Sequence, residues 1–331
     1  MYVGVDYHKR YSVATKMDDG GNILERGKIM NTAQSLLQFA ASLPEESTIA
    51  VEATSSWYYF YELMETRCPN IVLAHPLKTR AIAEARIKTD KIDSTMLAHL
   101  LRTNLLPTSY IPPRAIRDTR EILRYRASLI SMRTALKNRV HAILEKNGTR
   151  IEASDIFGKK AIRQLRELPL RDCYRVGIDG YLRVMDVLAS LIDEVSSIID
   201  ARVREQSDAS LLCTIPGIGP FSALLIMSEI GDIHRFPSAK KLCSYAGLVP
   251  SVHASGGKTR YGSLTKRGSK WLRWILIELS HHFARSSEKM RALYQRIAYK
   301  HGRNTARVAV ARQMLTIIYA MLKEGRPFVK G

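Results

Sequence analysis

The strongest constraint on the fold is a pair of short apolar runs that each end in a carboxylate. Residues 2–5 lead into Asp6, and residues 48–51 lead into Glu52. Short apolar runs bounded by polar residues are typical of buried strands. We therefore predict that both carboxylates stand at the ends of strands in a sheet.

A second acidic pair, Asp90 and Asp93, lies at the predicted start of a helix. Residues at i and i+3 share one helix face, about 5–6 Å apart at Cβ, where two carboxylates repel each other unless a cation lies between them. The alternative is an ordinary helix start, with Asp90 as N-cap and Asp93 in a first turn that the helix dipole makes favourable for acids. Combined with Asp6 and Glu52, the pair predicts a site for hard cations such as Mg²⁺.

The remaining pattern of the N-terminal third predicts a mixed α/β sheet. Strands are predicted at residues 2–7, 11–18, 23–31, 48–53 and 71–74, and helices at 33–42, 58–66 and 90–103. The acids then fall in the order strand 1, strand 4, final helix. That order is similar to the layout of ribonuclease H-like nucleases, including Holliday-junction resolvases, and to a two-metal site with ions ~3.5–4 Å apart.

Residues 114–205 have an almost wholly helical pattern, with a long helix at 117–147. Near-heptad apolar spacing at 181–206 predicts a helical hairpin or coiled coil, packed either within one chain or between two. Breaks are predicted at Asn147-Gly148 and over Gly177–Gly180. Further on, we predict a helix ending at Ile230, a loop-like region at 247–268, and helices at 269–284, 287–299 and 303–323.

The net charge of +20 is unevenly distributed. Residues 1–110 are neutral overall, whereas residues 206–331 carry 20 Lys/Arg against 6 Asp/Glu. Between Ile233 and Ile277 there are nine Lys/Arg and no Asp or Glu. A stretch of one charge sign favours an anionic partner, and nucleic acid is the leading candidate. The alternative is a basic surface that serves solubility alone.

Two short motifs in the basic region are further candidates. Gly217 and Gly219 resemble the hairpin of helix-hairpin-helix modules, in which backbone N–H groups approach a phosphate, although a simple turn explains them as well. Ser255 lies within the acid-free stretch, where cations can activate a hydroxyl and neutralise a phosphate. The composition of this segment also fits an ordinary loop serine. Nearby, His253 could act as a base or bind phosphate. The cations that follow the serine are Lys258, Arg260, Lys266, Arg267, Lys270 and Arg273.

Composition excludes several other classes of protein. The chain has no apolar run of about 18 residues, so no membrane span is expected, and its N-terminus has no signal-peptide pattern. The four cysteines lack CxxC spacing, which predicts buried thiols in a reducing compartment and no zinc or disulfide framework. The cysteines are Cys68, Cys173, Cys213 and Cys243.

Taken together, these motifs resemble the DEDD-type insertion-sequence transposases, a family of bridge-RNA-guided serine recombinases. The resemblance covers nearly the whole chain, and Ser94 departs from it where the family more often has alanine. It rests on Gly4-Val5-Asp6, Val51-Glu52-Ala53-Thr54, Lys88-Thr89-Asp90-x-x-Asp93, Ile215-Pro216-Gly217-Ile218-Gly219, Tyr245-Ala246-Gly247-Leu248-x-Pro250, Ser255-Gly256 and Lys266-x-Gly268-x-x-x-Leu272-Arg273.

The resemblance implies a RuvC-like (ribonuclease H-like) α/β domain at residues 1–145, a helical coiled-coil domain at 146–206, and a mainly α transposase domain at 207–331. It implies that the acidic tetrad binds Mg²⁺, with two ions per site, and that Ser255 is the nucleophile that forms a covalent bond to DNA. The partners implied are donor and target DNA, a noncoding bridge RNA that pairs with both, and further copies of the chain in a dimer or tetramer. In the tetramer, tetrad and serine come from different subunits.

Three functions remain open on the sequence. The first is the RNA-guided recombinase, which needs both tetrad and serine. The second is a RuvC-like metal nuclease that uses water as nucleophile and needs the tetrad alone. The third is a nucleic-acid-binding protein without catalysis, whose binding depends on salt. We expect a cytoplasmic, nucleoid-associated prokaryotic protein.

Overall fold

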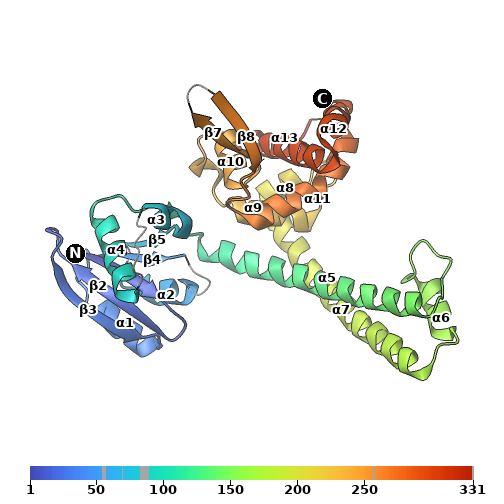
Figure 1. Cartoon of the computed structure of the whole chain (residues 1–331), viewed down its shortest axis with the longest axis horizontal. Coiled ribbons are helices and arrows are strands. Elements are labelled where there is room, and N and C mark those ends of the chain that lie inside the picture. The colour runs from blue at the N-terminus through green and yellow to red at the C-terminus, as the bar shows by residue number, and fades with distance from the viewer. Residues whose placement is uncertain (54–56, 69, 83–88, 256–257, 330–331) are drawn as a thin grey trace. The chain divides into compact units, whose positions relative to one another are not determined.

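The protein divides into two compact units, Met1–Ile111 and Pro112–Gly331 (Figure 1). The computed structural model describes residues 1–53, 57–68, 70–82, 89–255 and 258–329, and for residues 253–255, 258, 259 and 261 it describes the backbone alone. Within these ranges, no helix is long and apolar enough to cross a membrane. The predicted domain boundaries after residues 145 and 206 stay predictions.

A six-stranded mixed sheet forms the first unit, in the order β3-β2-β1-β4-β5-β6. Its strands are β1 (Tyr2–Tyr7), β2 (Tyr11–Met17), β3 (Ile23–Met30), β4 (Thr48–Glu52), β5 (Ile71–Ala74) and β6 (Thr108–Ser109). Strands β1, β4 and β5 are parallel, and β2, β3 and β6 pair antiparallel. The predicted mixed α/β sheet is confirmed; β6 was not predicted because two residues carry no periodic pattern.

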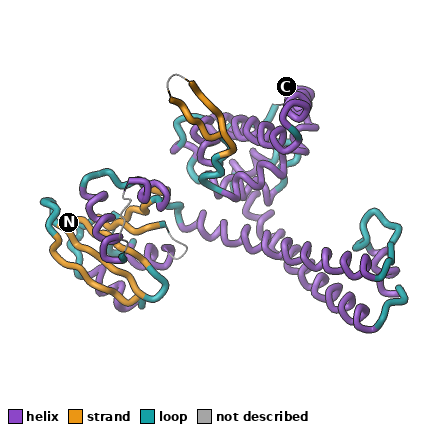
Figure 2. Tube along the Cα trace, viewed as in Figure 1, coloured by secondary structure: helices purple, strands orange, loops and turns teal. Residues whose placement is uncertain are grey.

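Helices cover both faces of this sheet (Figure 2). They are α1 (Ala33–Ala41), α2 (Trp57–Met64), α3 (Pro76–Ile82) and α4 (Asp90–Arg102). Because side chains alternate along a strand, Val3 and Val5 join one core with Leu36 of α1 and Phe60 of α2. The opposite face carries a smaller core between β4, β5 and α4.

The helix α4 lies against β1 at Gly4. A Cβ built on Gly4 would come within 2.0 Å of the Ser94 carbonyl oxygen and 2.6 Å of the Ala98 nitrogen. Ser94 is fully buried, and its hydroxyl lies 2.9 Å from that of Thr15 on β2. The serine therefore faces the sheet, and small residues on both elements permit this close approach.

A long helical hairpin opens the second unit (Figure 1). It consists of α5 (Arg114–Lys146) and α7 (Asp172–Glu205), joined through α6 (Lys159–Glu167). The break predicted at Asn147 is confirmed as the C-cap of α5, whereas the break predicted over Gly177–Gly180 is wrong because α7 runs through it. A glycine inside a helix costs only about 1 kcal/mol, which packing against α5 offsets.

The apolar stripe of α7 packs within the chain. Leu188, Ile192, Val195 and Ile199 are all buried, in one core with residues of α5 and of the C-terminal helices. A second set of apolar residues on α7 is exposed, and a dimer contact there stays a prediction. These residues are Val176, Val184, Val187 and Ile198.

The rest of the second unit is a helical cluster with one hairpin of strands (Figure 2). Its helices are α8 (Ser207–Leu212), α9 (Pro220–Ile230), the 3₁₀ helix η1 (Ile233–Arg235), α10 (Ala239–Tyr245), α11 (Lys270–Ser286), α12 (Glu288–His301) and α13 (Arg303–Glu324). The loop-like region predicted at 247–268 is wrong, because β7 (Pro250–Ser255) and β8 (Lys258–Leu264) pair antiparallel there. Glycines and cations in this segment conceal the alternation of a strand.

The cysteines only partly meet the expectation of buried thiols. Cys68 and Cys243 are buried and Cys213 is half-buried, whereas Cys173 is exposed in the first turn of α7. Burial raises the pKa of the Cys68, Cys213 and Cys243 thiols. The expectation is therefore wrong for Cys173.

Candidate functional site

Two of the predicted acids stand at the carboxyl ends of neighbouring parallel strands. The register of β1 on β4 pairs Val5 with Val51, and Asp6 and Glu52 each follow one residue later. Side chains two residues apart on a strand lie on the same face, so Asp6 shares the face of Gly4 and Glu52 shares the face of Ala50. Gly4 and Ala50 both lie toward α4. The sheet register therefore sets these two carboxylates side by side on the face that α4 covers.

The other two acids occupy the first turn of α4. Thr89 caps this helix, since its side chain accepts a hydrogen bond of 3.3 Å from the Ile92 amide. The alternative that Asp90 is the N-cap is therefore wrong, and Asp90 and Asp93 are both helical. The contact of α4 with β1 brings this turn to the end of the strands, so all four predicted acids gather at one place.

The environment of Asp6 reports this gathering. Asp6 is 8% exposed, and burial is the main cause that raises the pKa of its carboxyl above the usual value. The adjacent His8 lowers this pKa, whereas the negative charges of Asp90, Asp93 and Glu52 raise it. A carboxylate held among three others is a strong attractor for a cation, because a cation removes their mutual repulsion.

Two residues belong to this cluster and were missed from the sequence: His8 in the β1–β2 turn and Tyr11, the first residue of β2. His8 Nε2 lies 3.2 Å from Oδ2 of both Asp6 and Asp90. Tyr11 donates a hydrogen bond of 3.0 Å to the same oxygen of Asp90, which raises the pKa of the Tyr11 phenol. The sequence position of His8 could have revealed it, because His8 follows Asp6 by two residues and side chains at that spacing on an extended chain share a face.

A pocket of about 240 Å³ opens beside the cluster. Asp6, Glu52 and Asp93 line it, together with Thr79 and Arg80 of α3. Carboxylate oxygens are the ligands that hard divalent cations prefer, and one carboxylate oxygen of Asp6 and one of Asp90 lie within 4.8 Å of each other and of a His8 ring nitrogen. The residues present therefore fit a divalent metal, and Arg80 adds a positive charge suited to a phosphate.

The other predicted residues lie in the second unit. Ser255 is the last residue of β7, and the register pairs it with Lys258 of β8; both side chains lie outside the described residues, as does that of His253. Arg260, Lys266, Arg267 and Lys270 are exposed. Arg273 is half-buried and donates a hydrogen bond of 3.1 Å to the Ala246 carbonyl, while burial lowers the pKa of its guanidinium.

Two glycines hold the ends of the β7–β8 hairpin together. Gly247 has φ +68°, and a Cβ there would lie 2.5 Å from the Arg267 carbonyl oxygen. Gly268 has φ +98°, and a Cβ there would lie 1.9 Å from the Tyr245 carbonyl oxygen. Only glycine adopts such conformations without strain and permits this approach. The chain entering the hairpin is thus fixed against the chain leaving it.

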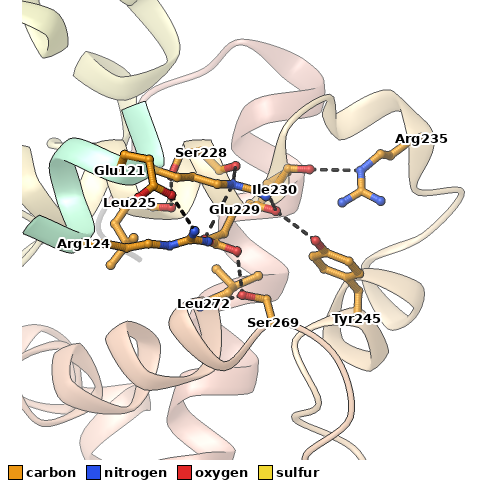
Figure 3. Close-up of polar contacts among 11 residues, drawn as sticks. Glu121, Arg124, Leu225, Ser228, Glu229, Ile230, Arg235, Tyr245, Ser269 and Leu272 are labelled. Atoms are coloured by element: carbon orange, nitrogen blue, oxygen red, sulfur yellow. Dashed lines mark hydrogen bonds and ion pairs between the residues drawn. The ribbon is translucent and has the colours of Figure 1, made fainter. Parts of the chain in front are cut away.

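A buried polar network supports this clamp (Figure 3). Glu229 of α9 is 4% exposed and accepts a hydrogen bond of 2.8 Å from Ser269, the N-cap of α11. Its carboxylate also lies 3.5 Å from Arg124 and 3.6 Å from Arg120, both on α5. The Tyr245 hydroxyl donates to the Glu229 carbonyl at 3.2 Å. One carboxylate thus joins α5, α9 and α11 beneath the hairpin, an arrangement that no local pattern revealed.

The glycine-rich motif forms the turn between α8 and α9. Gly217 has φ +90°, and a Cβ there would lie 2.8 Å from Cβ of His282 on α11, so packing alone accounts for this glycine. Gly219 caps α9 and has open space around it. A role for the two glycines in binding phosphate stays a prediction.

Comparisons with known proteins agree with this arrangement. Residues 3–147 match the family model of the DEDD domain of IS110 transposases, described as "Transposase", and residues 209–295 match the model described as "Transposase IS116/IS110/IS902 family". The transposase for insertion sequence element IS1111A of Coxiella burnetii is 25% identical over 97% of this chain and 89% of its own. The IS1328 transposase of Yersinia enterocolitica is 24% identical over 99% of this chain and 98% of its own. The pilin gene-inverting protein of Moraxella bovis is 28% identical over 85% of this chain and 82% of its own. The chain belongs to the IS110/IS116 family of DEDD transposases and is a DNA-processing enzyme.

Proposed function

We propose that the protein is an insertion-sequence transposase that cuts and rejoins DNA through a covalent bond between Ser255 and DNA, with Mg²⁺ at the acidic tetrad. The observation that carries the proposal is the gathering of Asp6, Glu52, Asp90 and Asp93 at one end of the mixed sheet. Bound there, Mg²⁺ would polarise the scissile phosphate and stabilise the leaving oxygen.

The chain's own residues supply the remaining chemistry. Ser255 Oγ attacks phosphorus, the Oγ–P bond forms and the P–O3′ bond breaks. The serine proton is released and the 3′ oxygen takes up a proton, so charge and atoms balance. In the second step a 3′ hydroxyl of the other DNA attacks the serine ester, and Ser255 leaves with a proton. Because each step exchanges one phosphodiester for another, rejoining needs no ATP.

Three further observations support this proposal. The exposed cations Arg260, Lys266, Arg267 and Lys270 can contact phosphates near the hairpin that carries Ser255. The clamp at Gly247 and Gly268 fixes that hairpin on the helical cluster. The Moraxella bovis relative is named for inverting a pilin gene, and inversion requires rejoining as well as cutting.

We also propose that a noncoding bridge RNA pairs with donor and target DNA and supplies the sequence specificity, while a dimer or tetramer of this chain holds the DNA. Sequence selection by base pairing leaves the protein to recognise backbone and shape. The excess of Lys and Arg over Asp and Glu in residues 206–331 fits that division of work. Light scattering of the complex assembled with RNA and both DNAs gives the number of subunits.

The deciding experiment incubates the chain with its RNA, both DNAs and Mg²⁺, and then denatures the mixture. A protein–DNA adduct that Ser255→Ala abolishes is the expected result. Cleavage that persists in Ser255→Ala would show a metal nuclease that uses water. Binding without cleavage in the unaltered protein would show a nucleic-acid-binding protein. Asp90→Asn should lose the adduct and keep RNA binding, and a loss of RNA affinity would instead assign the tetrad a structural role.

A further inference from the structure

A groove in the second unit combines exposed aromatic rings with cations. It has a volume of about 790 Å³ and lies between α5, α9 and α11. Trp274 is 41% exposed, and Trp271 is half-buried beside it, with ring centroids 5.6 Å apart at an interplanar angle of 82°. Such exposure of a large indole is unusual in a groove, because indoles are among the residues that gain most from burial.

The walls of the groove combine apolar side chains with cationic and polar ones. Arg126 stacks its guanidinium 4.7 Å from the centre of the Phe221 ring, and Lys270 is exposed at the start of α11. Ser131, Thr134 and Asn138 are exposed along α5. Among the described residues that line the groove, none is acidic. The groove therefore complements an anion that also carries a flat apolar face.

We propose that this groove binds an unpaired base of single-stranded DNA, with Trp274 as the stacking platform and Lys270 and Arg126 near the flanking phosphates. Every base has a face that stacks on an indole, and aromatic side chains combined with cations are the common means of holding single strands. This enzyme family acts on DNA, and any exchange of strands leaves bases transiently unpaired. The proposal does not depend on Ser255 or on the metal site.

The test is a titration of the full-length chain with a short oligothymidylate, with binding measured by tryptophan fluorescence. The chain carries Trp57→Phe, so that only Trp271 and Trp274 contribute to the emission. Quenching on binding is expected, and Trp274→Ala should weaken the affinity by about tenfold to a hundredfold. Trp274→Phe should retain most of the affinity. The matched control is Tyr299→Ala, because Tyr299 is an aromatic residue 92% exposed on α12 and should have no effect.

A backbone control separates stacking from charge. An oligonucleotide of the same length with abasic sites keeps the phosphates and lacks the bases, so it should bind the unaltered chain weakly and be insensitive to Trp274→Ala. A fully paired duplex should also be insensitive. Ser255→Ala should leave oligothymidylate affinity unchanged, so a failed cleavage assay and a failed binding assay remain distinguishable.

Three results would overturn the proposal. The first is equal binding of the abasic and the intact oligonucleotide. The second is a stronger Trp274 dependence for a matched oligouridylate than for oligothymidylate, which would assign the groove to RNA. The third is a change of oligomeric mass in Trp274→Ala with unchanged oligonucleotide affinity, which would show that another protein chain covers the groove.

Discussion

Ser269 donates a hydrogen bond of 2.8 Å to a carboxylate oxygen of the buried Glu229, and the same serine accepts the amide of Leu272 to cap α11. One hydroxyl therefore ties the start of α11 to α9 and, through the carboxylate, to two arginines of α5 (Figure 3). The hairpin that carries Ser255 ends at Leu264, five residues before Ser269. We therefore expect the placement of this hairpin to depend on Ser269 and Glu229.

Glu229→Ala should lower the free energy of unfolding by about 3–5 kcal/mol, because it leaves the buried guanidinium of Arg120 without the carboxylate that it pairs with. The matched control is Glu121→Ala. Glu121 pairs with the same Arg124 at 3.0 Å, but its side chain is 67% exposed, so the loss should be at most about 0.5 kcal/mol. Urea denaturation of both variants measures the difference. Equal losses would show that the buried carboxylate has no special role.

Gly4→Ala should displace α4, because the new methyl group would overlap the backbone of Ser94 and Ala98. We expect a loss of about 1–3 kcal/mol in stability together with loss of metal-dependent activity, since Asp90 and Asp93 move with the helix. Gly27→Ala is the control, because nothing lies within 4 Å of a Cβ there. Unfolding curves and DNA cleavage report both effects, and normal activity in Gly4→Ala would contradict the assignment of α4 to the site.

The raised pKa of Asp6 predicts how metal-free protein responds to pH. Because the folded pKa lies above the unfolded value of 3.8, the folded state binds this proton more tightly. The stabilising contribution is full below pH 3.8 and is lost as the pH rises through the raised pKa. Thermal unfolding without divalent ions should show this loss in the unaltered chain and not in Asp6→Asn.

Addition of Mg²⁺ gives a second comparison between the unaltered chain and Asp6→Asn. At neutral pH, Mg²⁺ at one hundred times its dissociation constant should stabilise the unaltered chain by about 2.7 kcal/mol through preferential binding to the folded state. Asp6→Asn should lose most of this gain. Equal stabilisation of both proteins would place the ion elsewhere.

His8→Gln should reduce DNA cleavage by about tenfold to a hundredfold, the usual effect of removing a group that orients metal ligands. The distances of 3.2 Å to Asp6 and Asp90 are the basis of this expectation. The loss should appear as a higher Mg²⁺ requirement, because the ligands are less well placed. A lower rate at every Mg²⁺ concentration with an unchanged requirement would refute this positioning role.

Gly180→Ala should stabilise the chain by about 0.5–1 kcal/mol, because this residue lies inside α7 with nothing within 4 Å of a Cβ. Gly148→Ala should have the opposite sign, since Gly148 has φ +60° in the turn after α5. Helical circular dichroism during urea unfolding measures both. Destabilisation by Gly180→Ala would instead support the helix break that the sequence pattern indicated at this position.

The N-terminal sheet and its four acids could be predicted because strand alternation and strand ends are local properties of the sequence. The same locality explains the failures. Gly177 and Gly180 resemble a helix break until the packing of α7 on α5 outweighs their cost, and β7 and β8 are concealed by glycines and cations. The contacts of His8 with Asp90 and of Glu229 with Ser269 join residues far apart in the chain, so only the folded structure reveals them.

The helical hairpin of α5 and α7 has a consequence for engineering. α5 has 33 residues, which at about 1.5 Å each make a helix roughly 50 Å long, and its first half packs in the core with α9 and α11. Its distal apolar cluster, which includes Val140, Leu165 and Ile178, is separate from the core that holds α9 and α11. One heptad inserted into each helix should therefore extend the arm by about 10 Å and leave both ends as they are. The length of this arm should then be adjustable without a change in either apolar core.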